Sequence, residues 1–416
     1  MAEKRWTDGQ LDAMSARRGT VLVAAAAGSG KTEVLVQRAI QRLTDPENPT
    51  DADKLLVVTF TKDAAAGMRE RLERRFRELL QQRPGDARLQ RQSILLTQAH
   101  IGTVDSFCAE IDREFFHLLG IAPDFKVLPD ERRREMMSSA LSEAVADAYS
   151  SGAGGVLADA FSGARDDSSL LNMVTTIYDY MQSHPFPEQW LQEKTDMYFP
   201  GKGTLPAGQP TPWQQVILEY VGEAATHCSA LLDRGIQELA ESEPLEAAFR
   251  VPLEQDRECF QGMESLAAAG DWDGLREAVL SFKQASARSP KGFGEDPLVL
   301  RVKAVRSEVK DTAKELSKYL EVDNAACARE TAQAAPLVKG IQDLVLDFSR
   351  RYDEKKRQGG FLDFSDLEHC AIRLFLEPDG SPTPAAREVS QRFDEIMIDE
   401  YQDINEVQDS LFRAVS

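Results

Sequence analysis

Cysteine is scarce in this chain, and no two cysteines lie close together in the sequence. The 416 residues include five cysteines, none of which forms a C-x-x-C pair. This pattern argues against a disulfide framework and against a zinc site, and it fits a reducing compartment. The five are Cys108, Cys228, Cys259, Cys327 and Cys370.

Long apolar runs are also missing. The longest, from Val21 to Ala27, is far too short to cross a bilayer. The first residues are polar and lack the apolar stretch of a secretory signal peptide. We therefore expect a soluble, cytoplasmic protein with no membrane partner.

Basic residues are outnumbered by acidic ones. The chain has 49 Lys and Arg against 69 Asp and Glu, for a net charge of −20. Taken alone, this balance argues against nucleic-acid binding, because phosphates attract basic surfaces. The charge is uneven, however, since residues 62–91 carry nine Lys and Arg but only five Asp and Glu. An acidic body with a basic channel fits this distribution, and so do ordinary solvated helix surfaces.

Strand and helix patterns alternate over the first 128 residues, as is typical of a parallel sheet with crossover helices. Residues 129–335 are rich in Ala, Glu and Leu and are predicted to be helical. A short apolar strand returns at residues 393–398. We therefore predict an α/β fold in which residues 1–128 and 336–416 form one domain, interrupted by a large, mainly α-helical inserted domain. The predicted strands of the first part are residues 20–23, residues 55–59 and a strand ending at residues 101–103.

A glycine-rich turn lies between the first predicted strand and the helix after it, which is the setting of a phosphate-binding loop. Small residues in such a turn let backbone N–H groups surround phosphates at a helix N-terminus. Lys31 adds a positive charge for the phosphates, and the Thr32 hydroxyl can bind Mg²⁺. The usual pattern has Gly where this chain has Ala25, which alanine tolerates if its φ stays negative. The loop residues are Ala27, Gly28, Ser29, Gly30, Lys31 and Thr32.

Two adjacent carboxylates follow the last predicted strand. A phosphate-binding-loop NTPase needs a carboxylate there for Mg²⁺, which suits Asp399. A second carboxylate can orient and deprotonate the attacking water, which suits Glu400. An acid pair at a strand end is also compatible with a simple helix cap, but its pairing with the glycine-rich loop favours ATP binding. We expect the loop and the acid pair to lie on neighbouring strands and to bind one Mg-ATP.

The motifs resemble those of the UvrD/RecB branch of superfamily 1 helicases. Residues 27–32 are similar to motif I of that family, and residues 399–403 to motif II. Thr7-x-x-Gln10 resembles the Q motif, which implies that Gln10 reads the adenine. Residues 59–69 are similar to motif Ia, and residues 103–108 to motif Ib. The resemblance implies a RecA-like P-loop NTPase domain with ATP and Mg²⁺ as cofactors.

The same resemblance implies contacts with single-stranded DNA. Motif Ia places Thr59, Phe60 and Thr61 on the DNA, with Phe60 offering a ring for base stacking. A core position at the end of a strand is the alternative for Phe60. Motif Ib implies phosphate contacts from Thr103 and Ser106. The family usually has His where this chain has Asp105, which would repel phosphate unless it faces away.

Residues 361–367, 185–191 and 393–395 resemble AddA subunits of bacterial AddAB helicase–nucleases more than plain UvrD-type helicases. That family implies 3′-to-5′ helicase activity on single-stranded DNA and duplex ends, a heterodimer with an AddB-type partner, and a role in double-strand break repair and recombination. Two alternatives remain: a UvrD-like repair helicase without a nuclease, and a truncated non-motor protein that binds DNA or a partner. The later motifs of the second motor domain are not among these 416 residues, so we expect the chain alone to hydrolyse ATP very slowly.

Overall fold

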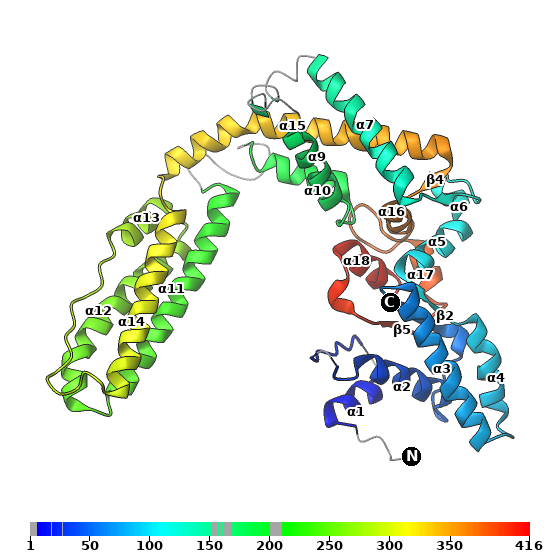
Figure 1. Cartoon of the computed structure of the whole chain (residues 1–416), viewed down its shortest axis with the longest axis horizontal. Coiled ribbons are helices and arrows are strands. Elements are labelled where there is room, and N and C mark those ends of the chain that lie inside the picture. The colour runs from blue at the N-terminus through cyan, green and yellow to red at the C-terminus, as the bar shows by residue number, and fades with distance from the viewer. Residues whose placement is uncertain are drawn as a thin grey trace. The chain divides into compact units, whose positions relative to one another are not determined.

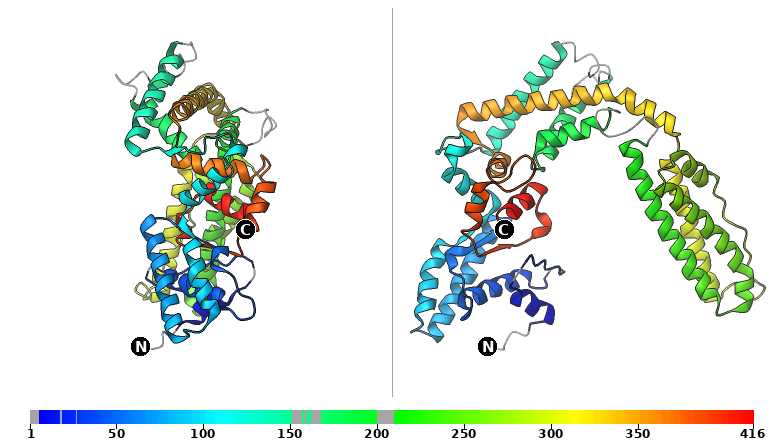
Figure 2. Two further views of the ribbon diagram at one scale, coloured as in Figure 1. Left: turned by 90° about the vertical axis from the view of Figure 1, so that its right-hand side faces the viewer. Right: turned by 180° about the vertical axis from the view of Figure 1, so that it is seen from behind.

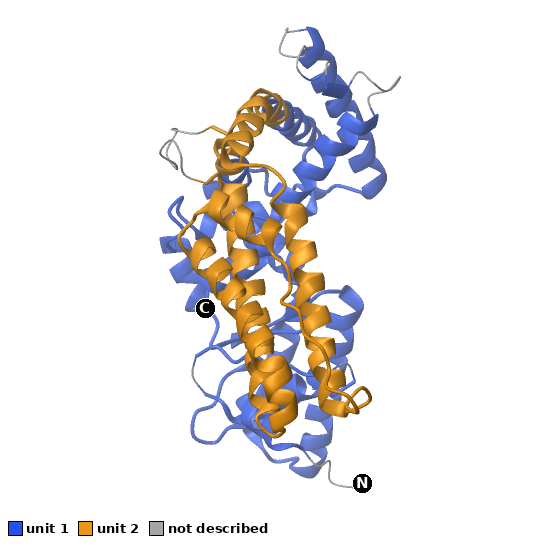
Figure 3. Cartoon of the chain, turned by 90° about the vertical axis from the view of Figure 1, so that its left-hand side faces the viewer, with its two compact units in different colours: residues 1–191, 343–416 blue, residues 192–342 orange. Residues whose placement is uncertain are grey.

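The computed structural model describes residues 6–17, 19–26, 28–150, 157, 160–161, 168–199 and 210–416. They form two compact units, residues 1–191 with 343–416 and residues 192–342 (Figure 3). This division places residues 129–191 in the unit that contains the sheet, whereas the predicted domain boundary lies at residue 128. None of the helices in the described ranges combines the length and the hydrophobicity of a membrane span.

The first unit alternates strands and helices along the chain (Figure 1). Its elements up to residue 191 are α1 (Asp8–Ser15), α2 (Lys31–Thr44), η1 (Ala52–Lys54), β1 (Leu55–Thr59), α3 (Lys62–Gln82), α4 (Ala87–Leu95), η2 (Leu96–Gln98), β2 (His100–Thr103), α5 (Val104–Glu114), α6 (Phe116–Leu119), β3 (Lys126–Val127), α7 (Asp130–Ser150), α9 (Ser168–Met181) and the start of α10 (Pro187–Asp196). From residue 343 they are the second half of α15 (Asn324–Gly359), β4 (Phe361–Leu362), α16 (Phe364–Phe375), α17 (Pro384–Ser390), β5 (Glu395–Ile398), η4 (Tyr401–Asp403) and α18 (Glu406–Ala414).

The main sheet has three parallel strands in the order β2-β1-β5. All five residues of β1 are buried, because helices cover both faces of the sheet. Side chains alternate between the faces: Leu55 and Val57 pack against α2, α3 and α4. Leu56 and Val58 pack on the opposite face with α5, α16 and α18. The result is the layered α/β arrangement that the sequence predicts.

A chain segment of nearly 300 residues separates β2 from β5, yet both strands border β1. Val58 pairs with Gly102 of β2 on one side and with Ile398 of β5 on the other. Because the strands are parallel, their carboxyl ends meet at one edge of the sheet, and ligands of open α/β sheets bind at that edge. A second, two-stranded parallel sheet joins β3 to β4.

Helices are the regular secondary structure of the second unit in its described residues, and residues 282–296 form a non-helical connection between two of them. Its helices are the end of α10, α11 (Pro212–Leu239), α12 (Glu243–Ala268), α13 (Trp272–Ser281), α14 (Pro297–Leu316), η3 (Ser317–Tyr319) and the first half of α15. Helices α11, α12 and α14 run side by side (Figures 1 and 2). The sequence sets the start of α11 locally, because Thr211 and Gln214 form a capping box with Pro212 as the first helical residue. Buried Leu232, Leu253 and Phe260 belong to the apolar core of this unit.

Most predicted elements of the first unit are confirmed, but the first strand is wrong. Residues 20–26 form no strand, and Val21, Leu22 and Val23 are 41%, 72% and 41% exposed. The apolar, β-branched run has strand propensity. A strand, however, also needs a neighbour for its backbone hydrogen bonds, and no described strand pairs with this segment. Residues 200–212 are rich in Gly and Pro, which predicts a loop within the helical region, and most of them lie outside the described residues.

Candidate functional site

The glycine-rich turn leads directly into α2. Gly28 and Gly30 have φ values of 77° and 85°, a left-handed conformation that favours glycine. Ser29 N–H donates to the carbonyl of Ala26 at 3.2 Å, and Gly30 is the N-cap of α2. The first backbone N–H groups of α2 have no partner within the helix, so the turn and the helix start form an anion-binding end. Ala27, predicted to belong to this loop, lies outside the described residues.

Ala25 fits the turn in spite of the missing glycine. Glu400 is the one non-glycine residue with positive φ in the described part of the chain, so Ala25 keeps a conformation that alanine adopts without strain. Lys31 is the first residue of α2, and its Nζ donates to the Ala25 carbonyl at 3.1 Å. The predicted phosphate-binding lysine is therefore folded back onto its own loop.

Gln10 connects α1 to the same loop. Its Oε1 accepts from the backbone N–H of Thr7, and the Thr7 hydroxyl accepts from the Gln10 N–H, which makes a capping box at the start of α1. Its Nε2 donates to the Ser29 carbonyl at 3.1 Å. The structure thus brings Gln10 to the glycine-rich turn, and its predicted contact with adenine stays a prediction.

Thr32 and Asp399 meet although 367 positions separate them in sequence. The Thr32 hydroxyl donates to Oδ2 of Asp399 at 3.1 Å, from the first turn of α2 to the residue after β5. Asp399 is held by its backbone N–H, which donates to the Val58 carbonyl at 2.9 Å. The loop and the acid pair therefore come together, but through a helix end and a strand end, not through the neighbouring strands that we predicted.

Glu400 adopts a left-handed backbone, with φ 56° and ψ 43°. Its N–H donates to Oδ1 of Asp399 at 3.1 Å, and Nε2 of Gln402 donates to its carboxylate. A non-glycine residue in this region is strained, and strain of this kind clusters at functional sites. The bend turns the chain sharply after β5 and leaves the Glu400 side chain exposed beside Asp399.

Thr32 and Asp399 form a donor set that fits Mg²⁺. A hydroxyl and a carboxylate oxygen are the hard ligands that this ion prefers, and it commonly completes its shell with substrate phosphates and water. Within the described ranges, no group of three or more His, Cys, Asp or Glu residues gathers to hold a metal by itself. An ion at this site would therefore depend on a phosphate ligand beside the two side chains.

The residues of motifs Ia and Ib lie at the same sheet edge, because Thr59 pairs with Thr103 at the ends of β1 and β2. Thr59 is 2% exposed and donates to the Thr61 carbonyl at 3.0 Å. Thr103 is 6% exposed and caps α5 by accepting from the Ser106 N–H at 3.2 Å. The hydroxyls of Thr59 and Thr103 are therefore buried and bonded to nearby backbone groups. The other three predicted DNA-binding residues, Phe60, Thr61 and Ser106, are exposed.

Phe60 is 60% exposed, so the alternative of a core position is wrong. Thr61 follows it and caps α3 by accepting from the Ala64 N–H at 3.1 Å. Gly102 sits close to Ser106, since a Cβ at position 102 would lie 2.4 Å from the Ser106 hydroxyl. Phe60 is thus an exposed aromatic ring on the short connection between β1 and α3.

Asp105 follows Thr103 in the first turn of α5 and is half-buried. Its pKa is raised by burial and lowered by the nearby positive charge of Lys62. Glu368 on α16 is a second buried acid in this part of the unit, and burial raises its pKa to about 7 while Gln408 donates to it. The negative charge of Asp105 contributes to the raised pKa of Glu368, so the two carboxyls lie near each other, and the orientation of Asp105 away from a phosphate stays a prediction.

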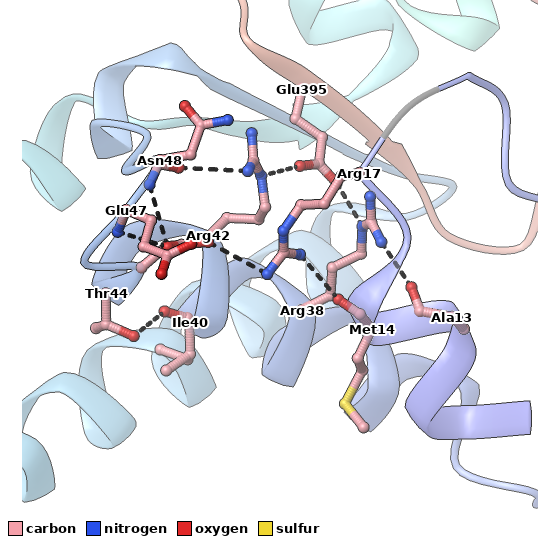
Figure 4. Close-up of polar contacts among 11 residues, drawn as sticks. Ala13, Met14, Arg17, Arg38, Ile40, Arg42, Thr44, Glu47, Asn48 and Glu395 are labelled. Atoms are coloured by element: carbon pink, nitrogen blue, oxygen red, sulfur yellow. Dashed lines mark hydrogen bonds and ion pairs between the residues drawn. The ribbon is translucent and has the colours of Figure 1, made fainter. Parts of the chain in front are cut away.

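Three charged residues near the site were not predicted. Arg38 and Arg42 of α2 both donate to Glu395, the first residue of β5 (Figure 4). Both arginines lie on the helix face that also carries buried Ala39 and Leu43. Arginine at buried helical positions is the signal that could have found them, because a buried charge needs a partner. The sequence does not say that the partner lies some 350 residues away.

Comparison with known proteins places these observations in a family. The A subunit of the ATP-dependent helicase/nuclease of Ruminiclostridium cellulolyticum is 34% identical over 428 residues, an alignment that covers 100% of this chain and 34% of the relative. The protein of the same name from Acetivibrio thermocellus is 35% identical over 430 residues, with the same coverage. That of Moorella thermoacetica is 35% identical over 426 residues, with 30% of the relative covered. The chain spans about a third of the length of these curated relatives.

The family profile of the UvrD/REP helicase N-terminal domain matches residues 6–416. This match includes the glycine-rich turn, the sheet edge and the acid pair, and it extends over the helical second unit. Together with the α/β fold and its parallel sheet, the match supports a RecA-like helicase fold. The chain belongs to the UvrD/REP helicase N-terminal domain family.

Proposed function

We propose that this chain is the ATP-binding segment of a DNA motor, in which the loop at residues 28–32 holds the phosphates of ATP. Lys31 would exchange its bond with Ala25 for the phosphate oxygens. Thr32 and Asp399 would hold Mg²⁺, which neutralises charge on the phosphates when it is bound. Glu400 would accept a proton from the attacking water. Gln10 would read the adenine from its place beside Ser29.

The hydrogen bond between Thr32 and Asp399 is the observation that carries this proposal. It joins the helix end beside the glycine-rich turn to the acid that follows β5. A glycine turn alone or an acid pair alone has ordinary structural explanations. Their convergence on one hydroxyl–carboxylate pair is what Mg-ATP binding requires.

We further propose that single-stranded DNA binds along the carboxyl edge of β1 and β2. Phe60 supplies an exposed ring on which any base can stack. Thr61 and Ser106 lie at the starts of α3 and α5, where helix dipoles favour phosphate. Thr59 and Thr103 would then have a structural role, stabilising the ends of β1 and β2, since both are buried.

For the whole protein we propose the activity named in its relatives, that of an AddA-type component of an ATP-dependent helicase/nuclease. In that proposal the motor moves 3′ to 5′ on single-stranded DNA from duplex ends, works with an AddB-type partner, and acts in double-strand break repair and recombination in the cytoplasm. Residues 129–335 would be an inserted domain of the RecA-like fold, with residues 1–128 and 336–416 forming the ATPase domain. The isolated chain would hydrolyse ATP very slowly, because the arginines that stabilise the transferring phosphate come from a second motor domain in this family.

Calorimetric titration of the 416-residue chain with ATP in the presence of Mg²⁺ tests the central claim. We expect saturable binding that Lys31→Ala abolishes, while Lys54→Ala, at a lysine in η1 away from the loop, leaves it unchanged. Absence of binding by the folded wild-type chain would remove the proposal. ATP turnover by the isolated chain at about 10 s⁻¹, a common enzyme rate, would contradict only the statement that it is slow alone.

A further inference from the structure

One carboxylate joins the helix of the glycine-rich loop to the strand of the acid pair. Glu395 accepts from Nε of Arg38 at 2.5 Å through Oε1 and from Nε of Arg42 at 2.7 Å through Oε2 (Figure 4). We call Arg38, Arg42 and Glu395 the arginine–glutamate triad. Its side chains are only 17%, 10% and 13% exposed. These are charge-assisted hydrogen bonds of fixed direction, shielded from most of the solvent.

The triad also reaches α1. Nη1 of Arg38 donates to the carbonyl of Ala13 at 2.6 Å, in the last turn of α1 (Figure 4). Helix α1 carries Gln10, whose amide holds Ser29 of the glycine-rich turn. Arg38 of α2 is therefore bonded to both α1 and β5. Each of these three elements bears or adjoins a predicted ATP-binding residue.

The triad lies a short distance from the Thr32–Asp399 pair, farther along α2 than Thr32 and earlier along β5 than Asp399. Arg38 is two helical turns from Lys31, a distance of about 10 Å along α2. Glu395 is four residues before Asp399, about 13 Å along β5. Because a helix and a strand each keep a nearly fixed length, a connection at Arg38 and Glu395 sets how far apart Thr32 and Asp399 lie.

Apolar packing between α2 and β5 does not fix that distance equally well. Met397 of β5 shares a core cluster with Val36, Ala39 and Ile40 of α2. Such contacts are non-directional, so they do not select one relative position of α2 and β5 as hydrogen bonds do. Burying two arginines and a glutamate costs desolvation, and a well-packed apolar replacement is often as stable as the ion pairs. The specific contribution of the triad is therefore to fix the position of β5 relative to α2, and not to add stability.

We propose that the arginine–glutamate triad positions Asp399 relative to Thr32 and so sets the Mg²⁺ dependence of nucleotide binding. The three are positioning residues, since none of them lies in the predicted ATP or metal set. This inference rests on the proposed function. Lys31 and the N–H groups of the turn all belong to the α2 side, so they hold phosphates without help from β5. Only the metal site needs both elements at once.

The experiment measures ATP affinity of the 416-residue chain by calorimetry, once with Mg²⁺ and once with a chelator. Two variants break the triad. Glu395→Gln removes the charge, and the triple variant Arg38→Met, Arg42→Met, Glu395→Met replaces all three ions with apolar side chains that can keep the chain folded. We expect the enhancement of affinity by Mg²⁺ to fall roughly tenfold, the scale on which residues behind metal ligands act. Affinity without Mg²⁺ should stay within about twofold, the usual scatter of uncoupled sites.

Glu114→Gln is the matched control. Glu114 on α5 accepts from Arg392 through both oxygens, at 2.6 and 2.7 Å, so the variant neutralises another carboxylate of the same unit that is bonded through both oxygens. This pair is more exposed than the triad, and its hydrogen bonds involve neither α2 nor the glycine-rich turn. The variant should keep the full Mg²⁺ enhancement. Melting temperature, recorded for every variant, separates a loss of stability from a loss of metal coupling.

Two results would overturn the proposal. One is a folded triple variant with the wild-type Mg²⁺ enhancement. The other is an equal fall of affinity with and without Mg²⁺, which would make the triad a general support of the loop. Failure of the proposed function is distinguishable from these two results, because it is visible in the wild-type chain alone. In that case the wild-type chain binds no ATP, or binds ATP with the same affinity with and without Mg²⁺.

Discussion

The hydroxyl of Thr32 lies 3.1 Å from Oδ2 of Asp399, so the first turn of α2 and the end of β5 share a hydrogen bond. The two residues are 367 positions apart in the sequence, so the contact depends on the tertiary structure. The pair marks the point where a glycine-rich turn and an acidic strand end become one site. Its role can be measured by changing each partner in turn.

Removal of either partner should weaken Mg²⁺-dependent nucleotide binding. For Thr32→Ala and for Asp399→Asn we expect at least a tenfold loss of ATP affinity with Mg²⁺, on the scale of roughly 10- to 100-fold for disturbed metal sites. Thr44→Ala is the matched control, because that hydroxyl donates to the Ile40 carbonyl at the other end of α2 (Figure 4). Equal affinities for all three variants in calorimetry would show that the pair holds no metal.

Glu400 should matter for turnover more than for binding. Glu400→Gln removes the base but keeps the size of the side chain, so the ATPase kcat of the full-length protein should fall by roughly 10²–10⁴. ATP affinity should change little, since the phosphates are held by the loop and Lys31. A steady-state ATPase assay beside equilibrium binding separates the two quantities. A variant with unchanged kcat would assign the proton transfer to another group.

The left-handed backbone of Glu400 should cost stability. Glycine adopts φ near 56° without the Cβ clash that costs other residues about 1–2 kcal/mol. Glu400→Gly should therefore unfold at a denaturant concentration equal to or higher than that of wild type, even though it abolishes ATP hydrolysis. Glu400→Ala provides the comparison, because it loses the same carboxylate but keeps the Cβ. A glycine variant less stable than the alanine variant would show that the bend is not strained.

Phe60 should contribute to the binding of single-stranded DNA through stacking. Phe60→Ala should weaken binding of a labelled oligothymidylate by about 1–3 kcal/mol, the range for one base–aromatic stack, while Phe60→Trp should retain it. Fluorescence anisotropy at several salt concentrations gives the affinities. Their salt dependence should not change, because no charge is removed. Ile94→Ala, at a 67% exposed apolar residue of α4, should bind like wild type; a similar loss there would assign the effect to general surface change.

Asp112 should make the chain less stable as pH rises. Its carboxylate is fully buried in α5 with no hydrogen-bond partner on either oxygen, and burial raises its pKa to about 8, partly opposed by Arg373 and Arg113. The folded chain therefore keeps the proton between about pH 4 and 8, whereas the unfolded chain releases it. Stability from this group is fully present below about pH 4 and is lost progressively as pH rises to 8.

Asp112→Asn should reduce that dependence. Relative to wild type, its melting temperature should rise steadily from pH 5 to pH 8, since each unit of pKa difference corresponds to about 1.4 kcal/mol. Differential scanning fluorimetry across this range gives the comparison. The exposed Asp124→Asn serves as the control. Parallel curves for wild type and Asp112→Asn would mean that Asp112 is ionised in the fold.

Local sequence was enough to predict much of the first unit. The strand at residues 55–59, the strand ending at Thr103 and the helices after them depend on apolar periodicity and on caps within a few positions, such as Thr61 and Thr103. The turn at Gly28 and Gly30 follows equally from neighbours, because glycine alone adopts its φ values without strain. The Q-motif, Ia and Ib residues were singled out differently, by the resemblance of short segments to helicase motifs.

Only the tertiary structure decided which distant groups meet. Residues 20–23 have strand propensity, but propensity does not supply the neighbouring strand that would pair with them. Arg38 and Arg42 share a helix with apolar residues, but their partner Glu395 lies more than 350 positions away in the sequence. Asp112 looks like a surface acid until α16 packs against α5. Secondary structure and turns arise from interactions within a few residues, which the sequence by itself determined. Long-range packing decides which residue pairs with a buried charge and which strand lies beside another, and no local sequence pattern encodes these contacts.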